Sequence, residues 1–145
     1  MIKYINEHPV LYYFLSFTWG GIMSLIGAIV ILALIMVGKK PHKCGNSIYV
    51  EVGEYWGGLE LGCFFICCKN PGDHILLHES GHGIQNIMFG PLMPFIVSIP
   101  SAIRYWYRRL SQNNKTEYDA IWFEGQASAL GYEYNKEKLN EKCNK

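Results

Sequence analysis

The hydrophobic pattern of the chain begins with an apolar run from Pro9 to Gly38 that contains no Asp, Glu, Lys, Arg or His. About 20 apolar helical residues suffice to cross the hydrocarbon core of a bilayer. Aromatic residues gather in the first part of the run, from Leu11 to Trp19, as they do where rings lie at a lipid interface. The pattern predicts a transmembrane anchor over residues 9–38, preceded by a short N-terminal flank over residues 1–8.

The charged residues on either side of this run predict its orientation. Lys39, Lys40 and Lys43 follow the run, whereas Lys3 is accompanied by Glu7 before it. The positive-inside rule then predicts a single-pass protein of the cell membrane with its C-terminal domain in the cytoplasm. The five cysteines are consistent with a cytoplasmic domain. An odd number with an adjacent pair is a poor arrangement for a secreted fold that is held by disulfides.

After the lysines the pattern changes to shorter, mixed segments. Residues 47–68 combine aromatic and branched side chains with partial alternation around Gly57-Gly58, which predicts two strands joined by a tight turn, a β-hairpin or small sheet. The segment Asn70 to Asp73 then supplies an N-cap, a proline and an acid for the first turn of a helix. This helix should run to about Phe89, where Gly90-Pro91 ends it.

Composition narrows the class of protein. With 145 residues, the chain is long enough for one domain of ordinary size and not for two. Half of the residues are hydrophobic and 17% are charged, which is too apolar for a disordered chain. The formal net charge is +1, so no overall basic field recruits nucleic acid. We expect an α+β domain over residues 39–135 and a polar, solvated tail over residues 136–145.

The candidate chemistry lies on the helix predicted before Phe89, where residues 78–82 form an H-E-x-x-H sequence. Two histidines four residues apart lie on the same helical face, so the imidazoles of His78 and His82 can reach one metal ion. Glu79 lies beside that ion, where it can accept a proton from metal-bound water and hand it to a leaving amine. The motif predicts a Zn²⁺ site with His78 and His82 as ligands and Glu79 as general base and acid.

A catalytic zinc takes three protein ligands and keeps an open position for water, so the chain must supply one more donor. The segment from Tyr118 to Ala127 has helical periodicity that places Ile121, Glu124 and Ser128 on one side. Glu124 is the predicted third ligand, carried by a second helix.

At these residues the chain resembles the gluzincin class of zinc metallopeptidases, in which H-E-x-x-H on one helix is completed by a Glu on a later helix. The match covers His78 to His82 and Glu124 to Ser128, a small part of the chain. Many members of that class carry an Asp four residues after the ligand Glu to orient a histidine, whereas this chain has Ser128 there. Asp119 and Asp73 are the candidates to take over that orienting role.

A more diffuse likeness runs through the strings HESGHGIQN, PSAIRYWYR and YDAIWFEGQAS. In these strings the chain is similar to small uncharacterised bacterial membrane proteins that carry a predicted metallopeptidase motif. The likeness assigns no substrate.

Residues next to the motif have both a functional and an ordinary interpretation. His74 is either a further ligand or orienting group or, more simply, a surface histidine at a helix N-terminus. Gln85 and Asn86 either order the helix against the third ligand or cap its end. Gly81 and Gly83 weaken a helix, so they predict that another backbone, most naturally the hairpin, packs closely there.

A second stretch without ionisable side chains runs from Gly83 to Ile103, and three prolines interrupt it. If it crossed the bilayer, Glu124 would lie on the opposite side from the histidines. A re-entrant or membrane-lying segment over residues 84–109 keeps both ends on one side. The string from Arg104 to Arg109 fits a lipid interface, with a stacking platform for nucleic acid as the weaker alternative. A tyrosine of this string, or Tyr118, is a candidate to stabilise an oxyanion.

Taken as a whole, the sequence predicts a membrane-anchored zinc metallopeptidase acting on a peptide or protein substrate, with the lipid bilayer as a partner. The strand from Gly57 to Cys63 is either an edge strand that pairs with the substrate backbone or an ordinary core strand. The alternative from another class is a non-catalytic membrane protein in which the same residues form a structural zinc site or polar staple. Polar neighbours such as Lys69 and Asp73, and the lack of a downstream Asp-Gly ligand motif, disfavour an intramembrane protease.

Overall fold

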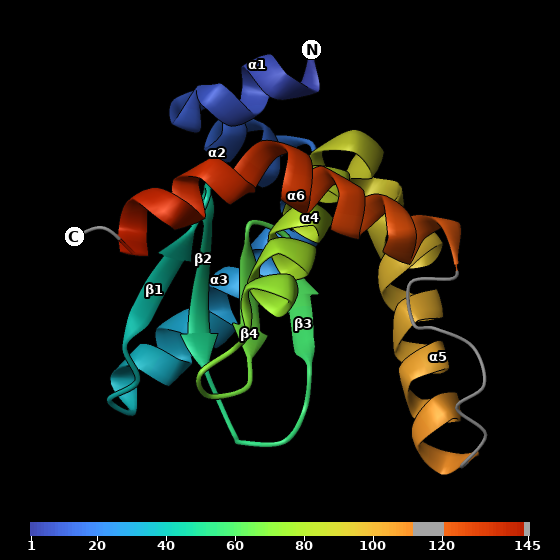
Figure 1. Ribbon diagram of the computed structural model, residues 1–145. Helices are drawn as coiled ribbons and strands as arrows, with labels where there is room; N and C mark the ends of the chain where they lie inside the picture. The colour runs from blue at the N-terminus through green and yellow to red at the C-terminus, as the bar shows by residue number, and fades with distance from the viewer. Residues whose placement is uncertain (112–120, 144–145) are drawn as a thin grey trace.

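The computed structural model describes the backbone of residues 1–111 and 121–143 and the side chains of residues 1–111 and 121–135. Helices lie on both faces of a small sheet (Figure 1), which confirms the predicted α+β class. The helices are α1 (Ile2–Glu7), α2 (Pro9–Thr18), α3 (Gly21–Met36), α4 (Asp73–Phe89), η1 (Gly90–Leu92), η2 (Pro94–Ser98), α5 (Ile99–Leu110) and α6 (Trp122–Cys143). The strands are β1 (Pro41–Cys44), β2 (Ser47–Glu51), β3 (Gly58–Leu61) and β4 (Phe64–Cys67).

The four strands form one mixed sheet in the order β1-β2-β4-β3, so β3 is an edge strand. β1 and β2 are antiparallel, β3 and β4 are antiparallel, and β2 runs parallel to β4 with Ile48 opposite Phe64. A small sheet is the predicted architecture, but the tight turn predicted at Gly57-Gly58 is wrong, because these residues lead into β3. The tight turns lie instead at Gly45 and Gly62, whose φ angles of 60° and 77° favour glycine.

α4 packs on one face of the sheet and α3 on the other (Figure 1). On the α4 face, Leu77 closes a buried core with Tyr49 and Phe65. On the α3 face, a Cβ added to Gly27 would collide with the carbonyl oxygen of Leu61, so the helix lies directly on the strand backbone. The sheet is therefore a thin middle layer that fixes the position of α4.

The single helix predicted over residues 9–38 is wrong: the run folds as two helices. α2 ends at Thr18, α3 begins at Gly21, and the two are bent by 102° relative to each other. A Cβ on Gly20 would collide with Asn86, so the glycine lets the chain turn directly against α4. α3 alone has 16 residues, or about 24 Å at 1.5 Å per residue, against a hydrocarbon core of about 30 Å.

The described helices were compared with the length and hydropathy that a membrane crossing requires. None of the helices within residues 1–111 and 121–143 meets that requirement alone. Two bent pairs meet it together, α2 with α3, and residues 73–92 with residues 94–110, the second pair bent by 113°. α4 ends at Phe89, directly before Gly90, which confirms the predicted end of the helix that carries the H-E-x-x-H sequence.

The N-terminal helix α1 is attached to the rest of the domain. Asn6 is buried, and its side-chain amide donates to the backbone oxygen of Tyr134 on α6 at 3.2 Å. The side-chain amide of Asn46, at the β1–β2 turn, donates to Asn6 Oδ1 at 3.1 Å. The beginning of the chain thus lies beside both the sheet and α6 (Figure 1).

α4 and α6 cross at close range, which is what brings their side chains together. A Cβ on Gly81 would overlap the carbonyl oxygen of Ala127, and one on Gly131 would overlap that of Leu77. The close backbone approach predicted from Gly81 is therefore confirmed, but the neighbour is α6 and not the hairpin. At Gly83 the neighbours include the β3–β4 turn as well as α2 and β2.

α6 begins at Trp122, as the periodicity of the predicted second helix indicates, and continues to Cys143. The segment predicted as a polar tail, residues 136–145, continues α6 as far as Cys143. Polar and charged residues with good helix propensity can extend a helix whose first turns are already held by packing.

Candidate metal centre

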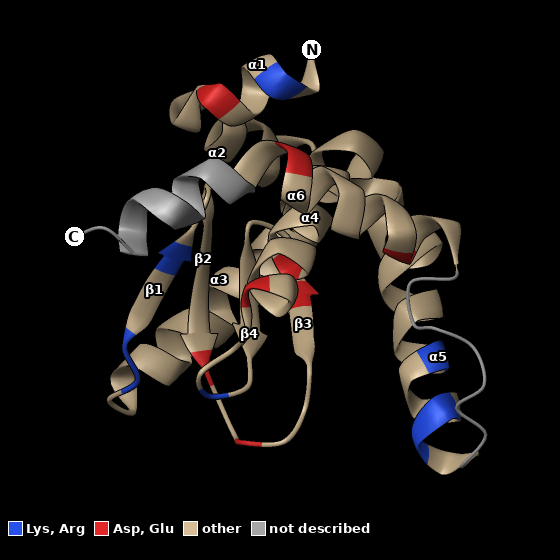
Figure 2. Cartoon of the chain, in the orientation of Figure 1, with Lys and Arg blue, Asp and Glu red and all other residues tan. Residues whose placement is uncertain are grey.

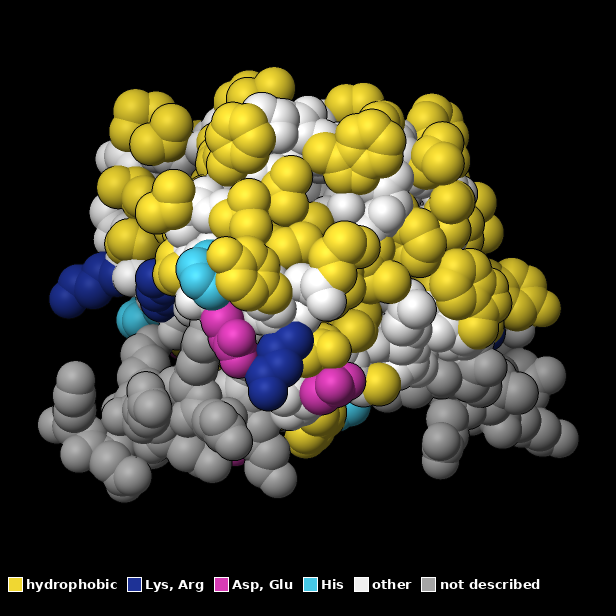
Figure 3. Space-filling model, turned by 90° about the horizontal axis from the view of Figure 1, so that it is seen from above, with side chains coloured by type: hydrophobic (Ala, Val, Ile, Leu, Met, Phe, Trp, Pro, Cys, Tyr) yellow, Lys and Arg dark blue, Asp and Glu magenta, His cyan; other side chains and the backbone are white. Residues whose placement is uncertain are grey.

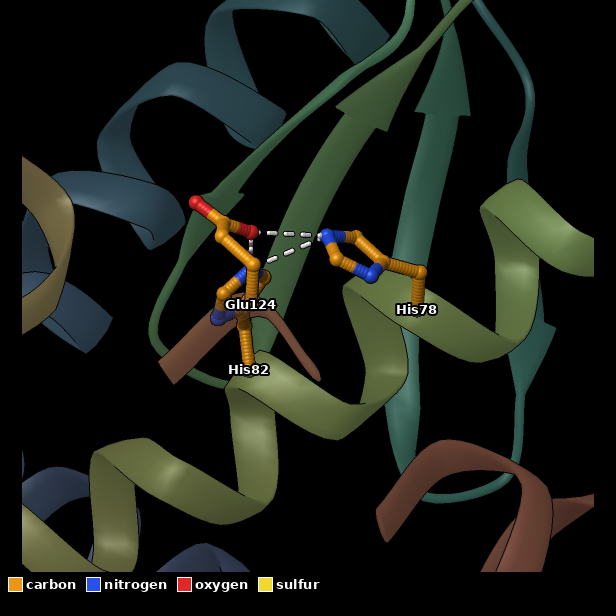
Figure 4. A group of neighbouring side chains, drawn as sticks. All are labelled: His78, His82 and Glu124. Atoms are coloured by element: carbon orange, nitrogen blue, oxygen red, sulfur yellow. Dashed lines mark hydrogen bonds and ion pairs between the residues drawn. The ribbon is translucent and has the colours of Figure 1, made fainter. Parts of the chain in front are cut away.

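The structure brings together the three residues predicted as metal ligands (Figure 4). His78 and His82 lie one turn apart on α4, and Glu124 reaches them from the first turn of α6. Glu124 Oε2 lies 3.1 Å from His78 Nε2 and 3.2 Å from His82 Nε2, and the two Nε2 atoms are 3.2 Å apart. All three side chains are buried, and together they form a group that could hold a metal ion.

Gln85 orients His82. Its amide nitrogen donates to the backbone oxygen of Phe123 and to Gln126 Oε1, each at 2.8 Å, so its amide oxygen faces His82 Nδ1 at 2.7 Å. Because an amide oxygen only accepts, Nδ1 of His82 carries the hydrogen. In neutral His82 the Nε2 lone pair is then directed at Glu124. The functional interpretation of Gln85, that it orders the helix against the third ligand, is the one that the geometry supports.

Ser128 orients His78. Its hydroxyl oxygen lies 2.8 Å from His78 Nδ1, one turn along α6 from Glu124. Ser128 therefore occupies the place where the gluzincin pattern has an orienting Asp, and Asp73 is not needed for that role. Asp119, the other candidate, lies outside the described residues. A hydrogen bond to the distal nitrogen of a ligand histidine fixes the orientation of the ring for metal binding.

The electrostatics of the group favour a cation at its centre. Burial acts to lower the pKa of His82, but the hydrogen bond to Glu124 and the charge of Glu79 raise it to about 9. Burial acts to raise the pKa of Glu124, but hydrogen bonds with His78 and His82 lower it. The second carboxylate oxygen, Glu124 Oε1, is buried and points away from the imidazoles (Figure 4), and a hydrogen bond with Ser101 also acts to lower the pKa of Glu124. A proton or a metal ion between Glu124 Oε2 and the two Nε2 atoms would satisfy these three acceptor atoms.

Glu79 lies beside the group without belonging to it. Its buried carboxyl group lies against Gly58 of β3, where an added Cβ would overlap it. Burial raises the pKa of Glu79, and the neighbouring His82 and His78 offset part of that effect. A carboxyl group with a raised pKa at the wall of a cavity is suited to take up and return a proton.

A cavity of about 330 Å³ opens over these residues. The buried side chains of His78, Glu79 and His82 line its floor. The edge strand β3 forms one wall with Gly58 to Glu60, and η2 and α5 form the opposite wall. The predicted strand at Gly57 to Cys63 therefore lies at the sheet edge, facing the candidate site across Gly58.

No protein-family model, curated protein or solved structure matches this chain. The function of the site is therefore inferred from its own geometry and chemistry.

Glu60 is a cavity residue that the sequence analysis missed. It is buried on β3, where one carboxylate oxygen accepts from the backbone nitrogen of Gly62 and the other lies 3.4 Å from Ser98 Oγ. Burial raises its pKa to about 8, although His82 and these hydrogen bonds act in the opposite direction. The available signal was a single charged residue within the short, otherwise uncharged strand GLEL.

The remaining candidates lie outside the metal-binding group. The ring of His74 is 6.0 Å from that of His78 and its Nδ1 lies 3.4 Å from the hydroxyl of Tyr132, so the surface interpretation of His74 fits better than the ligand one. Asn86 donates to the backbone oxygen of Gly20 and fastens α4 to the α2–α3 break. Of the tyrosines considered for an oxyanion, Tyr105 lines the cavity. Tyr118 lies outside the described residues.

Proposed function

We propose that this protein is a zinc-dependent peptidase in which His78, His82 and Glu124 hold the metal ion and Glu79 transfers the proton. The observation that carries the proposal is the convergence of two oriented imidazole nitrogens and a buried carboxylate beside a cavity. Tetrahedral zinc with bonds of about 2.0 to 2.1 Å holds its ligand atoms about 3.3 Å apart. The separations of 3.1 and 3.2 Å among the three ligand atoms fit that requirement.

The chain's own residues supply the proton transfer and the binding of the peptide. Zinc bound by this group would lower the pKa of a water molecule to about 7 and polarise a substrate carbonyl. In hydrolysis the water oxygen bonds to the carbonyl carbon and the C–N bond breaks. Glu79 accepts the proton of the water and returns it to the leaving nitrogen. The free edge of β3 offers backbone groups to an extended peptide lying along the cavity.

The decisive test compares Glu79→Gln with His78→Ala. Glu79 is not a ligand in this proposal, so Glu79→Gln should keep bound zinc and thermal stability while hydrolysis falls by about 10²- to 10⁴-fold. His78→Ala should lose zinc as well as activity. Metal analysis of the purified variants and cleavage of a fluorogenic peptide library measure both quantities. Bound zinc in an original protein that cleaves no member of the library would instead favour the structural-zinc alternative, and an unchanged rate in Glu79→Gln would contradict the proton-transfer role of Glu79.

The surface supports attachment of this peptidase to a lipid bilayer. Figure 3 shows hydrophobic side chains spread across one side of the molecule. Large apolar side chains are exposed along α2, α3 and the η2–α5 segment, among them Phe14, Ile29, Phe95 and Ile103. Exposed apolar patches much larger than a few hundred Å² are rare on soluble monomers. We infer that this side lies in the bilayer.

The attachment of α1 bears on how the chain enters the bilayer. A single crossing by residues 9–38 would put Asn6 on the opposite side of the membrane from Asn46 and Tyr134, with which it forms hydrogen bonds. The bent α2–α3 pair can enter and leave on the same side. The proposal is therefore a re-entrant or membrane-lying attachment with both ends on one side, the cytoplasmic side according to the lysines after α3.

A further inference from the structure

Helix α5 has two different faces, and each has a separate environment. One face carries Ser101, Ala102 and Tyr105, which line the cavity. The other carries large apolar side chains that the domain leaves exposed, including Ile99 and Ile103 at 48% and 65% exposure. No residue of α5 is buried. The helix is thus a thin partition between the candidate active site and the apolar surface.

Two large apolar residues line the cavity and are also exposed on the surface of the domain. Trp106 of α5 and Leu59 of β3 line the cavity, and their side chains are 57% and 46% exposed. They come from β3 and from α5, so large apolar side chains of both elements reach the exposed edge of the cavity, where the exposed Arg109 also lies. The buried part of the lining, by contrast, includes the polar side chains of Glu60 on β3 and Glu79 on α4.

The charges near this rim place it at the level of lipid headgroups. Residues 83–103 contain no ionisable side chain, and the last turn of α5 then carries Arg108 and Arg109. In Figure 2 the basic residues of α5, drawn in blue, lie toward its end. Arginines that follow an apolar, aromatic stretch suit the anionic surface of a bilayer.

We propose that the substrate is a membrane-anchored polypeptide, which enters the cavity from the bilayer surface between Leu59 and Trp106. This inference rests on the proposed peptidase function and specifies its substrate class. A polypeptide whose apolar segment is held in the same bilayer would present its adjoining residues to β3 without leaving the lipid.

The test uses the full chain in vesicles of phosphatidylcholine and phosphatidylglycerol. The probes are two fluorogenic libraries with the same eight randomised residues, one free in solution and one joined to a transmembrane Leu-Ala segment. The anchored library should be cleaved at least about tenfold faster at equal total concentration. Equal rates for the two libraries would overturn the inference and leave the peptidase function intact. If neither library is cleaved by zinc-loaded protein, both proposals fail.

A pair of variants tests whether the outer face of α5 contributes to cleavage of the anchored library. Ile99→Gln with Ile103→Gln changes only the outer face of α5 and leaves the cavity lining unchanged. It should remove most of the advantage of the anchored library while zinc content and the rate on the free library stay the same. Tyr55→Gln, which removes an exposed aromatic side chain from the β2–β3 connection, should keep the advantage.

If the double variant fails to fold, as its zinc content would show, Ile103→Gln alone is the replacement. Retention of the full advantage in a folded α5 variant would overturn entry past α5.

Discussion

At the scale of single residues, the candidate centre depends on side chains that orient its ligands. Gln85 joins His82 to the backbone of α6, and Ser128 holds His78 from the same helix. These contacts tie the direction of each imidazole to the position of the helix that carries Glu124. The ligand geometry and the α4–α6 packing are therefore parts of one arrangement.

Removing the partner of His82 should weaken metal binding specifically. Gln85→Ala loses the acceptor on His82 Nδ1 and the bond to Phe123, so zinc affinity should fall by about 10- to 100-fold. Competition with a chelating dye measures this affinity. Asn86→Ala is the matched control, because Asn86 is buried one residue along but bonds to Gly20. It should lower stability and leave zinc affinity unchanged; equal losses of affinity in both variants would contradict the orienting role.

Glu60 should give the protein a measurable dependence of stability on pH. Its pKa is about 8 in the folded protein against an ordinary value of 4.5, so the folded state holds the proton more tightly than the unfolded state does. This contribution to the free energy of unfolding is complete below pH 4.5 and is lost as the pH rises to about 8, at up to about 1.4 kcal/mol per pH unit.

Glu60→Gln removes this contribution together with its electrostatic effect on the neighbouring His82, while titrating groups far from Glu60 affect both proteins alike. Relative to the original protein, the variant should become more stable as the pH rises from 5 to 8. Chemical unfolding in one detergent across this range measures the difference. A difference that does not change with pH would show that the Glu60 carboxyl is not held protonated.

At the scale of elements, glycines set how closely the working parts approach one another. Gly81 and Gly131 let α4 and α6 cross with their backbones in contact, which brings Glu124 within reach of the histidines. Gly58 does the same between β3 and Glu79. In each case a side chain would force apart two elements that carry different parts of the site.

The contact between β3 and Glu79 can be tested with two adjacent glycines. Gly58→Ala should displace the Glu79 carboxyl group and lower the rate of peptide hydrolysis by up to about 100-fold, while zinc stays bound. Gly57→Ala is the control, since no atom lies within 4 Å of its added Cβ. Steady-state rates and zinc content of both variants measure the effect. An unchanged rate in Gly58→Ala would mean that the position of Glu79 against β3 does not matter for the reaction.

At the scale of the whole molecule, the apolar side and the site are connected through shared elements. α3 supports the sheet with one stripe of side chains and exposes the rest, and α5 separates the cavity from the exterior. α1 returns to the domain through Asn6. A molecule of this shape would rest on the bilayer with one side immersed, and both ends of the bent α2–α3 pair would stay on the same side of the membrane.

Topology labelling should report the two ends of the first apolar run alike. Single cysteines at Lys3 and Lys69, in a background without the native cysteines, should both be shielded from a membrane-impermeant reagent in intact cells and become reactive after lysis. The expectation follows from the bonds of Asn6 to the domain and from the lysines after α3. Labelling of Lys3→Cys alone in intact cells would restore the single-pass arrangement.

The sequence by itself indicated the ligand residues of the candidate centre and the two helices that carry them. The i, i+4 spacing of His78 and His82 needs only a helix to put both rings on one face, and the helix signals around it are local. The periodicity around Glu124 likewise indicated a second helix. A mixed α and β architecture also followed from local patterns. All of these inferences use residues within one or two turns of each other.

Only the tertiary structure decided which distant groups meet. The turn expected at Gly57-Gly58 was misplaced because strand pairing depends on the parallel β2–β4 contact, which leaves no local signal. The break between α2 and α3 lies at Gly20, where the chain packs directly against Asn86 of α4. Composition alone could not show this contact between distant residues. The contact of Ser128 with His78 and the position of Glu60 in the cavity were likewise not visible in the sequence. Whether a polar side chain is buried beside a site depends on how the elements pack.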